Sequence, residues 1–392
     1  MRLAYICSNP TYRLDVPSGY ATHIRELSTA FQEIGIDVST HLPQKYSGPG
    51  VISPGVRSHR LRGFVPTVVW EGLKDLRRLN SDRSFAHVLR REFKLIRPDV
   101  VYERIDYSGG AASSVAKIFR SRYVLEIHAP LDEEARTLSG PRPFWPWFRH
   151  RIWHALRAAD RIVVVSGVIR DWLQSNGVEA AKVVVISNGV NLEQFDPKRA
   201  EPSKNPPMKK PSELWIGFVG SDLVWYRLET LVDAFSRIPP EMNARLMIVG
   251  PAFRNVALRA HVDQSSAIDR IYFSGNVPHT DVPGVIMNFD ICVMPATTRY
   301  CSPIKLFEYG AMDKAVIVPD EAPVREVVEA EKEAILIRSG DVEQLAGALI
   351  RLARDPKLRQ RLGQNLGQRV RSQYSWIRVA KKIASEAFGG LK

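Results

Sequence analysis

Residues 290–320 read DICVMPATTRYCSPIKLFEYGAMDKAVIVPD, and this stretch decides the fold class. The apolar runs at its two ends, DICVMPA and KAVIVPD, have the composition of buried strands. Between them, SPIKLFEYGAM predicts a helix that opens with serine and proline. A strand, a helix and a second strand in this order are typical of a βαβ unit, so we expect a parallel sheet.

The same alternation continues on both sides of this stretch. The second half of the chain adds LWIGFVGS, LETLVDAFSRI, ARLMIVG and RIYFSG, and the first half contains LAYICS, HIRELSTAFQEIGI, DVSTHL, DVVYE, YVLEIHA and RIVVVS. Residues 197–213, PKRAEPSKNPPMKKPSE, contain five prolines and no apolar periodicity, which indicates an exposed linker. We predict an α/β protein of two Rossmann-like, doubly wound domains, residues 1–198 and 199–374, with a C-terminal helix at 375–392 that returns to the first domain.

The chain has 392 residues and a formal net charge of +13 at pH 7, which is the strongest deviation in its composition. Such a charge suits nucleic acid, an anionic membrane surface or phosphorylated substrates. Lys and Arg recur along the whole chain, so a scattered basic surface explains the charge as well. No RNP aromatic pair or zinc finger is visible, and we therefore expect no nucleic-acid partner.

Three cysteines, Cys7, Cys292 and Cys301, lack paired metal-ligand spacing, so we predict packing residues, without a disulfide framework or a metal site. No window approaches the roughly 20 uninterrupted apolar residues of a spanning helix. The start MRLAYICSNP predicts a strand rather than a cleavable leader, so we expect a cytoplasmic protein. Residues 141–157, PRPFWPWFRHRIWHALR, leave open a peripheral contact with an anionic membrane; the alternative is an acceptor-side loop and a helix with inward-packed aromatic side chains.

The helix that opens at SPIKLFE carries the residues best suited to chemistry. Its first backbone N–H groups can face a phosphate, and Lys305 would add a positive charge. Glu308 would accept hydrogen bonds from ribose hydroxyl groups. The alternative is a plain helix start, in which Ser302 is the cap, Pro303 lies in the first turn and Glu308 is solvated. The spacing alone does not separate the two interpretations.

The stretch CSPIKLFEYGAMDKAVIVPD resembles the SP-x-K-x-FEYMA-x-GKPVVA block of the retaining glycosyltransferases of family four. Further matching pieces follow the family's order over nearly the full length: PSGYATHIRELSTAF, LEIHAPLDEEA, AADRIVVVSGVIRDWL, VISNGVNLEQFDP, IGFVGSDLVWYRLETLVDAF, LMIVGP, GNVPHTDVPGVI and RSGDVEQLAGALIRLARD. The resemblance implies a GT-B fold, in which an acceptor-side domain and a donor domain face a central cleft. It also implies retaining transfer from a nucleotide sugar to a glycan, glycolipid or natural-product hydroxyl group, without a metal ion or another cofactor.

The same resemblance assigns site residues. His128, after the strand YVLEI, matches the active-site histidine that contacts the transferred sugar. Gly19 matches a glycine whose tolerance of unusual backbone angles lets the backbone approach a ligand, with an ordinary loop glycine as the alternative. Ser166, Asn188 and Gly189 match strand ends beside the cleft, although cap and turn chemistry explains them equally well. The donor-binding residues that we expect are Gly19, Gly220, Arg227, Ser302, Ile304, Lys305 and Glu308.

Three positions depart from the family's pattern. Tyr300 stands where the first glutamate of E-x7-E is expected, and Leu223 and Tyr226 replace basic residues of the usual pyrophosphate clamp. A phosphate in a water-poor cleft needs positive neighbours, and Arg227 and Lys305 are the candidate substitutes. These departures leave a second function open, namely a repurposed or inactive member of the fold with a weakened donor site.

Overall fold

The computed structural model describes residues 1–16, 18–43, 67–107, 110–138, 142–203 and 209–389. Contacts within the chain divide it into two compact units. Unit 1 comprises Met1–Val16, Tyr20–Ser187 and Val379–Lys392, and unit 2 comprises Pro17–Gly19 and Asn188–Arg378. Unit 1 is therefore assembled from segments that lie far apart in the sequence, whereas most of unit 2 is a single continuous segment.

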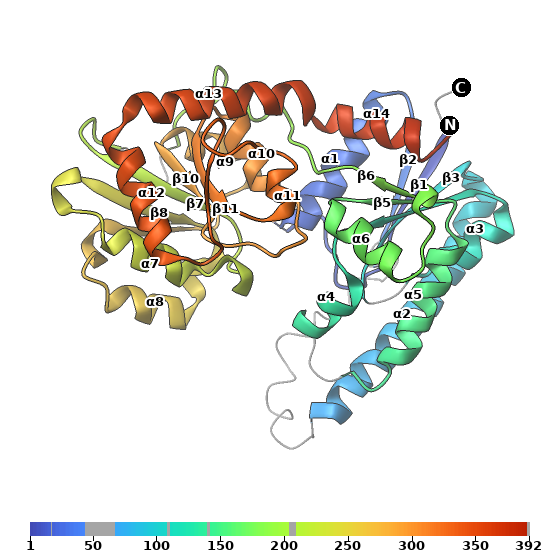
Figure 1. Ribbon diagram of the computed structural model, residues 1–392. Coiled ribbons are helices and arrows are strands. Elements are labelled where there is room, and N and C mark those ends of the chain that lie inside the picture. Colours follow the sequence, from blue (N-terminus) through green and yellow to red (C-terminus); the bar gives the residue numbers. More distant parts are fainter. Residues whose placement is uncertain (17, 44–66, 108–109, 139–141, 204–208, 390–392) are drawn as a thin grey trace. The chain divides into compact units, whose positions relative to one another are not determined.

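Unit 1 is built on a parallel sheet of six strands in the order β2-β1-β3-β4-β5-β6. Figure 1 shows the strands of this unit together with its helices. Its strands are β1 (Arg2–Cys7), β2 (Asp37–His41), β3 (Val100–Ile105), β4 (Arg122–Ile127), β5 (Arg161–Val164) and β6 (Val183–Val185). Its helices are α1 (Gly19–Glu33), α2 (Thr67–Ile96), α3 (Ser113–Phe119), α4 (Leu131–Leu138), α5 (Trp145–Ala158) and α6 (Gly167–Ser175), with the short η2 (Ala180–Lys182) and most of α14 (Trp376–Glu386). All of β1 from Leu3 to Cys7 is buried, as expected for a parallel strand covered on both faces.

Unit 2 has a second parallel sheet of six strands, in the order β12-β11-β10-β7-β8-β9. Its strands are β7 (Leu214–Val219), β8 (Ala244–Val249), β9 (Ile271–Gly275), β10 (Ile291–Val293), β11 (Ala315–Pro319) and β12 (Ile335–Ile337). Its α-helices are α7 (Leu228–Ser236), α8 (Val256–Asp263), α9 (Val282–Met287), α10 (Ile304–Ala311), α11 (Ala322–Arg325), α12 (Val342–Arg354) and α13 (Pro356–Gln373). Short 3-10 helices are η3 (Val224–Tyr226), η4 (Pro240–Met242), η5 (Pro251–Arg254), η6 (Ile268–Arg270) and η7 (His279–Asp281). The predicted α/β class with two doubly wound parallel sheets is confirmed.

Two hydrophobic cores lie on opposite faces of the second sheet, because successive side chains of a strand point to opposite faces. Ile216 and Phe218 of β7 belong to one core, and Trp215 and Val219 belong to the other. Gly217 lies between Ile216 and Phe218 in β7, and a Cβ atom there would come within 2.1 Å of the ring of Phe289. This glycine therefore makes room for an aromatic side chain of the second core.

The unit boundary differs from the one expected from the sequence. We predict a first domain of residues 1–198, whereas the long continuous segment of unit 2 begins at Asn188. Val190 donates its backbone N–H to the carbonyl of Tyr374 at 2.9 Å, and Phe195 is buried in a core of unit 2. The proline-rich segment is the feature of the sequence that indicated a boundary. The apolar residues Val190 and Phe195, which precede it, already pack in unit 2.

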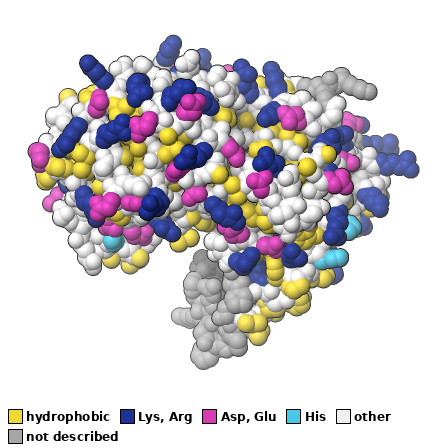
Figure 2. Space-filling model, viewed as in Figure 1, with side chains coloured by type: hydrophobic (Ala, Val, Ile, Leu, Met, Phe, Trp, Pro, Cys, Tyr) yellow, Lys and Arg dark blue, Asp and Glu magenta, His cyan; other side chains and the backbone are white. Residues whose placement is uncertain are grey.

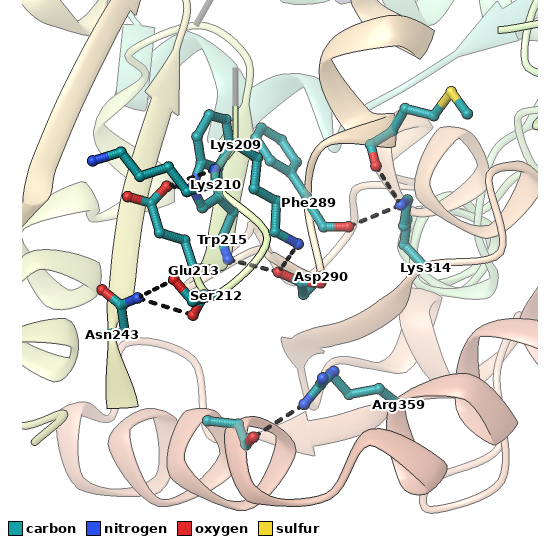
Figure 3. A network of polar contacts seen from close by, with 12 residues as sticks. Lys209, Lys210, Ser212, Glu213, Trp215, Asn243, Phe289, Asp290, Lys314 and Arg359 are labelled. Carbon is teal, nitrogen blue, oxygen red and sulfur yellow. Dashed lines mark hydrogen bonds and ion pairs between the residues drawn. The ribbon is translucent and has the colours of Figure 1, made fainter. Parts of the chain in front are cut away.

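A polar network holds the amino ends of three neighbouring strands of unit 2 together (Figure 3). Oδ2 of Asp290, just before β10, accepts from Nζ of Lys209 at 2.6 Å and from the backbone N–H of Trp215 in β7 at 2.7 Å. Lys314, just before β11, donates to two backbone carbonyls at 2.9 and 2.8 Å. Part of the predicted linker thus packs against unit 2, while residues 204–208 lie outside the described residues.

The residue Phe388, just after the last helix, packs in unit 1. We predict such a helix at 375–392, and the structure has it at Trp376–Glu386. The ring of Phe388 lies 5.4 Å from that of Phe31 and 5.6 Å from that of Tyr102, measured between centroids. Within the described ranges, no helix combines the length and the apolar character that crossing a membrane requires.

Candidate functional site

Two glycines follow neighbouring strands of unit 2 and lie close to each other. Gly220 follows β7 with φ 155°, and Gly250 follows β8 with φ 129°. A Cβ atom on Gly250 would lie 2.1 Å from the carbonyl oxygen of Gly220. Side chains are excluded at both positions, so the carboxyl edge of the sheet exposes bare backbone where ligands of open α/β sheets bind.

Lys305 lies against this bare backbone. A Cβ atom on Gly220 would be 2.2 Å from Cε and 2.6 Å from Nζ of Lys305. Nζ donates to the hydroxyl of Tyr226 at 2.8 Å and lies 5.6 Å from the ring centroid of Phe218. No carboxylate of the described residues forms an ion pair with Lys305. The neighbours of its ammonium group given above, a hydroxyl group and an aromatic ring, are neutral.

Glu308 follows Lys305 by three positions on α10 and is almost buried, with 7% of its surface exposed. Its Oε1 atom lies 3.0 Å from Nε2 of His279, the first residue of η7. Residues three apart on a helix share one face, so Lys305 and Glu308 are neighbours on α10. His279 was missed from the sequence, although it lies inside the matched piece GNVPHTDVPGVI.

The start of α10 differs from a simple serine cap. The helix begins at Ile304, and its cap residue is Pro303, which makes no side-chain hydrogen bond. The alternative interpretation, in which Ser302 is the cap of this helix, is therefore contradicted. Its Oγ accepts from the backbone N–H of Asn188 at 3.2 Å, and its carbonyl accepts from Nδ2 of Asn188 at 2.6 Å. Ser302 thus ties the loop before α10 to the segment after β6.

Arg227, the other candidate cation, lies elsewhere. It is exposed, has φ 46°, and packs against Gly340, where a Cβ atom would lie 2.6 Å from its Nη1. Of the two proposed substitutes, Lys305 is the one that supplies the atoms nearest to a Cβ position on Gly220, whereas Arg227 supplies those nearest to a Cβ position on Gly340. Leu223 packs against a hydrophobic core and Tyr300 is 8% exposed, so both replacements fill space at their positions.

In unit 1, a buried carboxylate lies between two imidazoles near the end of β4. Oε1 of Glu126 is 2.7 Å from Nε2 of His23 and 3.3 Å from Nε2 of His128. The hydroxyl of Tyr5 donates to Oε2 of Glu126 at 3.0 Å. The side chain of His128 is 18% exposed, and its ring lies edge-on to that of His23 at 4.6 Å.

The surroundings set the charges in this cluster. Burial opposes ionisation of Glu126, but His23 and His128 outweigh it and hold the pKa of Glu126 well below its usual range. Burial, and then the positive charge of Arg104, lower the pKa of His128 to about 3. At neutral pH the cluster is therefore an ionised carboxylate beside an uncharged His128.

The same three groups lie close enough together to be considered as metal ligands, because their ligand atoms lie within 4.8 Å of one another. Two features favour a hydrogen-bonded cluster instead. Glu126 is at hydrogen-bond distance from both His23 and Tyr5. Arg104 adds a positive charge that acts on His128 and Glu126, which would oppose a bound cation.

Gly19 is the first residue of α1 and does not have the backbone angles that we expected. Its φ angle is not positive, and a Cβ atom on this residue would meet no described atom within 4 Å. The predicted reason for glycine at this position is therefore wrong. Ser166 is buried directly before α6 but forms no side-chain cap, and a Cβ atom on Gly189 would lie 2.9 Å from the carbonyl of Tyr374.

Comparison with known families covers both units. Residues 17–194 match the model of Glycosyltransferase Family 4, and residues 213–355 match that of Glycosyl transferases group 1. The chain belongs to glycosyltransferase family 4. An uncharacterized glycosyltransferase of Methanocaldococcus jannaschii is 20% identical over 232 residues, which are 58% of this chain and 57% of that relative. The match thus spans little more than half of that protein's length.

Solved structures with the same architecture cover almost the whole of this family 4 glycosyltransferase. Sucrose-phosphate synthase from Thermosynechococcus elongatus has a TM-score of 0.73 at 19% identity, covering 98% of this chain and 97% of its own. HepE of Anabaena in complex with UDP-glucose has a TM-score of 0.70 at 14% identity, with 99% and 100% coverage. The predicted GT-B fold is confirmed.

Proposed function

We propose that this chain transfers a sugar from a nucleotide-sugar donor to an acceptor hydroxyl group, with retained configuration and without a metal ion. The observation that carries the proposal is the position of Lys305, whose ammonium group lies against the bare backbone of Gly220. A cation beside exposed backbone at the end of a parallel strand is suited to a diphosphate.

Glu308 extends the same surface by three positions along α10. An almost buried carboxylate beside a phosphate site is suited to accept hydrogen bonds from ribose hydroxyl groups. Gly220, Lys305 and Glu308 together would hold the diphosphate and the ribose of the donor, with Ser302 and Ile304 supporting the start of the helix. The UDP-glucose in the structure of HepE supports this class of ligand.

In the proposed reaction, the donor's leaving phosphate takes the proton of the acceptor hydroxyl group. Unit 2 contributes Lys305 as a fixed positive charge that stabilises the negative charge growing on the diphosphate. Unit 1 contributes His128, whose uncharged ring contacts the transferred sugar. No side chain acts as a nucleophile, so catalysis depends on positioning and on electrostatic stabilisation. Glycans, glycolipids and natural products are the acceptor classes that we propose.

The metal independence is tested by chelation. Incubation with EDTA followed by desalting should leave the rate of sugar transfer unchanged, and elemental analysis should find less than one metal ion per chain. A rate that falls after chelation and returns with one added divalent cation would contradict this part of the proposal.

The donor site is tested by thermal denaturation with UDP, GDP, ADP and dTDP and their common sugar conjugates. A ligand at about 100 times its dissociation constant stabilises a fold by roughly 2.7 kcal/mol. One nucleotide should raise the melting temperature, and Glu308→Ala should abolish the shift. Glu213→Ala is the matched control, because Glu213 is also nearly buried, at 8%, but lies before β7. It should lower stability and keep the response to the nucleotide.

A repurposed member of the fold is the second candidate, because Leu223 and Tyr300 replace groups that usually serve the donor. It predicts no response to any nucleotide sugar, or binding without release of the nucleoside diphosphate. Measuring that release over hours, with and without a mixture of sugar acceptors, separates this candidate from an active transferase.

We also propose a peripheral contact with an anionic membrane around residues 142–157. Phe144 and Trp147 are each 38% exposed, while Phe148 and Ile152 are buried, so only part of this segment packs inward. A Cβ atom on Gly72 of α2 would lie 3.7 Å from Phe144, which places exposed Val68, Val69, Leu73 and Leu76 of α2 near the same patch.

Flotation with vesicles containing phosphatidylglycerol should carry the protein, and replacing Trp145 and Trp147 by Ser should reduce the fraction that floats. Unchanged flotation would contradict the contact.

We propose no nucleic-acid partner. Figure 2 shows Lys and Arg side chains spread over the visible face and mixed with Asp and Glu, which favours a scattered basic surface there. Oligonucleotide binding with a steep dependence on salt concentration would contradict this.

A further inference from the structure

The contact between His279 and Glu308 continues on the other side of the imidazole. Nε2 of Gln194 lies 3.2 Å from Nδ1 of His279 and donates to the backbone oxygen of His279 at 2.7 Å. Nε2 of His279 lies 3.0 Å from Oε1 of Glu308. Gln194, His279 and Glu308 therefore form a continuous line of polar contacts within unit 2.

The backbone oxygen of His279 fixes the roles of the atoms in this line. A carbonyl oxygen only accepts hydrogen bonds, so the part of Gln194 that faces it is the amide NH2 group, which has two hydrogens. The second hydrogen is available to Nδ1 of His279, which then acts as the acceptor. A neutral imidazole with an accepting Nδ1 carries its hydrogen on Nε2, and this hydrogen is donated to Glu308.

A tight turn holds Gln194 in place. Oδ1 of Asn191 accepts from the backbone N–H groups of Glu193 and Gln194 at 3.0 and 3.2 Å. The next residue, Phe195, donates its backbone N–H to the carbonyl of Asn191 at 2.9 Å, and its ring lies 5.6 Å from that of His279. The line is thus supported by backbone geometry and by packing before any ligand arrives.

We propose that Gln194 and His279 are positioning residues of the donor site, which hold Oε1 of Glu308 and leave Oε2 to accept from the hydroxyl groups of the donor's ribose. This inference rests on the proposed function, since it gives Glu308 its ligand. No described residue donates to Oε2 of Glu308, and 9% of the side chain is exposed. Holding one carboxylate oxygen also fixes the direction of the other.

The first test reads the imidazole tautomer and needs no ligand. Two-bond ¹H–¹⁵N spectra of the full chain should show His279 with its hydrogen on Nε2 in the wild type. Gln194→Leu should shift the ¹⁵N resonance of Nδ1 of His279, which loses its hydrogen-bond donor, while the hydrogen stays on Nε2 beside Glu308. His261 is the internal control, because it contacts Asp233 on the surface of the same unit and its signals should not change. A wild-type His279 with its hydrogen on Nδ1 would overturn the inference.

The second test measures nucleotide affinity by calorimetry with UDP, GDP, ADP and dTDP. Gln194→Leu and His279→Ala should each lower the affinity for the bound nucleotide by on the order of tenfold. In His279→Ala, Oε1 of Glu308 loses its hydrogen-bond donor, and in Gln194→Leu the imidazole loses the amide that orients it. His279→Gln keeps an N–H donor and should recover most of the affinity, whereas a purely structural role would give no such recovery. His261→Ala should bind as the wild type does.

The outcomes separate the two proposals. Wild-type affinity in both Gln194→Leu and His279→Ala, in protein that melts as the wild type does, would overturn the positioning role alone. A wild-type chain that binds none of the four nucleotides or their sugar conjugates would overturn the proposed function, and the donor role of Gln194 and His279 with it.

Discussion

Oε1 of Glu126 lies 2.7 Å from Nε2 of His23, a residue 103 positions earlier in the chain. The carboxylate is 1% exposed, and Tyr5 and His128 approach it from β1 and from the end of β4. The charge of Glu126 is compensated by partners on three different elements. Removing this charge should therefore destabilise the contacts among these elements at the carboxyl edge of the first sheet.

Glu126→Gln should lower the free energy of unfolding by about 2–4 kcal/mol, because a buried carboxylate loses its charge-assisted hydrogen bonds. Urea unfolding followed by circular dichroism measures the change. Glu343→Gln is the control, since Glu343 is 78% exposed and its pair with Arg237 should be worth less than about 1 kcal/mol. Equal losses in the two variants would contradict the role of the cluster.

His128 should make stability depend on pH. An unfolded histidine takes up its proton near pH 6.5, whereas the pKa of His128 in the fold is about 3. The unfolded state of this histidine binds more protons between these values, so the contribution of His128 to stability falls as the pH falls below about 6.5, by at most about 1.4 kcal/mol per pH unit.

The depressed pKa of Glu126 adds a further loss only below about pH 4.5. Burial raises the pKa of Asp82 to about 6, of Glu103 to about 7 and of Glu134 to about 8, and these groups act in the opposite direction between pH 5 and 7.5. The contribution of His128 is therefore the difference between the profiles of the wild type and a His128 variant.

His128→Asn should remove the contribution of His128, so that as the pH falls through this window the variant loses less stability than the wild type, or gains more. The exposed His150 supplies the control His150→Asn, which should keep the wild-type slope. Parallel profiles for wild type and His128→Asn would contradict the expectation.

Gly220→Ala should weaken nucleotide binding strongly, because the new Cβ atom would displace Lys305 and because φ 155° strains any other residue. Isothermal calorimetry should show a loss of at least about tenfold. Gly347→Ala is the matched control in α12, where a Cβ atom meets nothing within 4 Å. It should bind as the wild type does and gain up to about 1 kcal/mol in stability.

Lys305→Met should lower affinity for a nucleoside diphosphate far more than for the corresponding nucleoside, because only the phosphates need the positive charge. A loss on the order of tenfold or more is expected for the diphosphate. Lys332→Met, at a lysine whose side chain is 58% exposed, should leave both affinities unchanged. A uniform loss for both ligands would show that Lys305 supports the fold of the site rather than the phosphates.

The sequence predicts the architecture well, because parallel strands covered on both faces leave unbroken apolar runs such as LWIGFV and AVIVP. The unit boundary is harder to predict. Composition marks the prolines from Pro197 onwards, whereas the physical boundary depends on where Val190 and Phe195 pack, and packing partners such as Tyr374 are far away in sequence.

The candidate site is predictable where one motif carries it. Lys305 and Glu308 are adjacent on a helix, so their spacing alone brings them to one face. His279, His23 and Glu126 could not be found in this way, because each meets its partner only after strands and helices are placed in register. Arg227 and Lys305 are equivalent as charges in a sequence, and only the backbone path, with φ 46° at Arg227, separates them.

The way in which unit 1 is completed has a consequence for synthesis on the ribosome. Unit 2 from Asn188 to Arg378 is translated before Val379–Lys392, which supply the final part of unit 1. All of that continuous segment can therefore emerge and begin to fold while the pocket for Phe388, between Phe31 and Tyr102, is still empty. Most of unit 1 is thus translated first, but unit 1 is the last to be completed. Until Phe388 has left the ribosome, the aromatic side chains that it covers are exposed to chaperones.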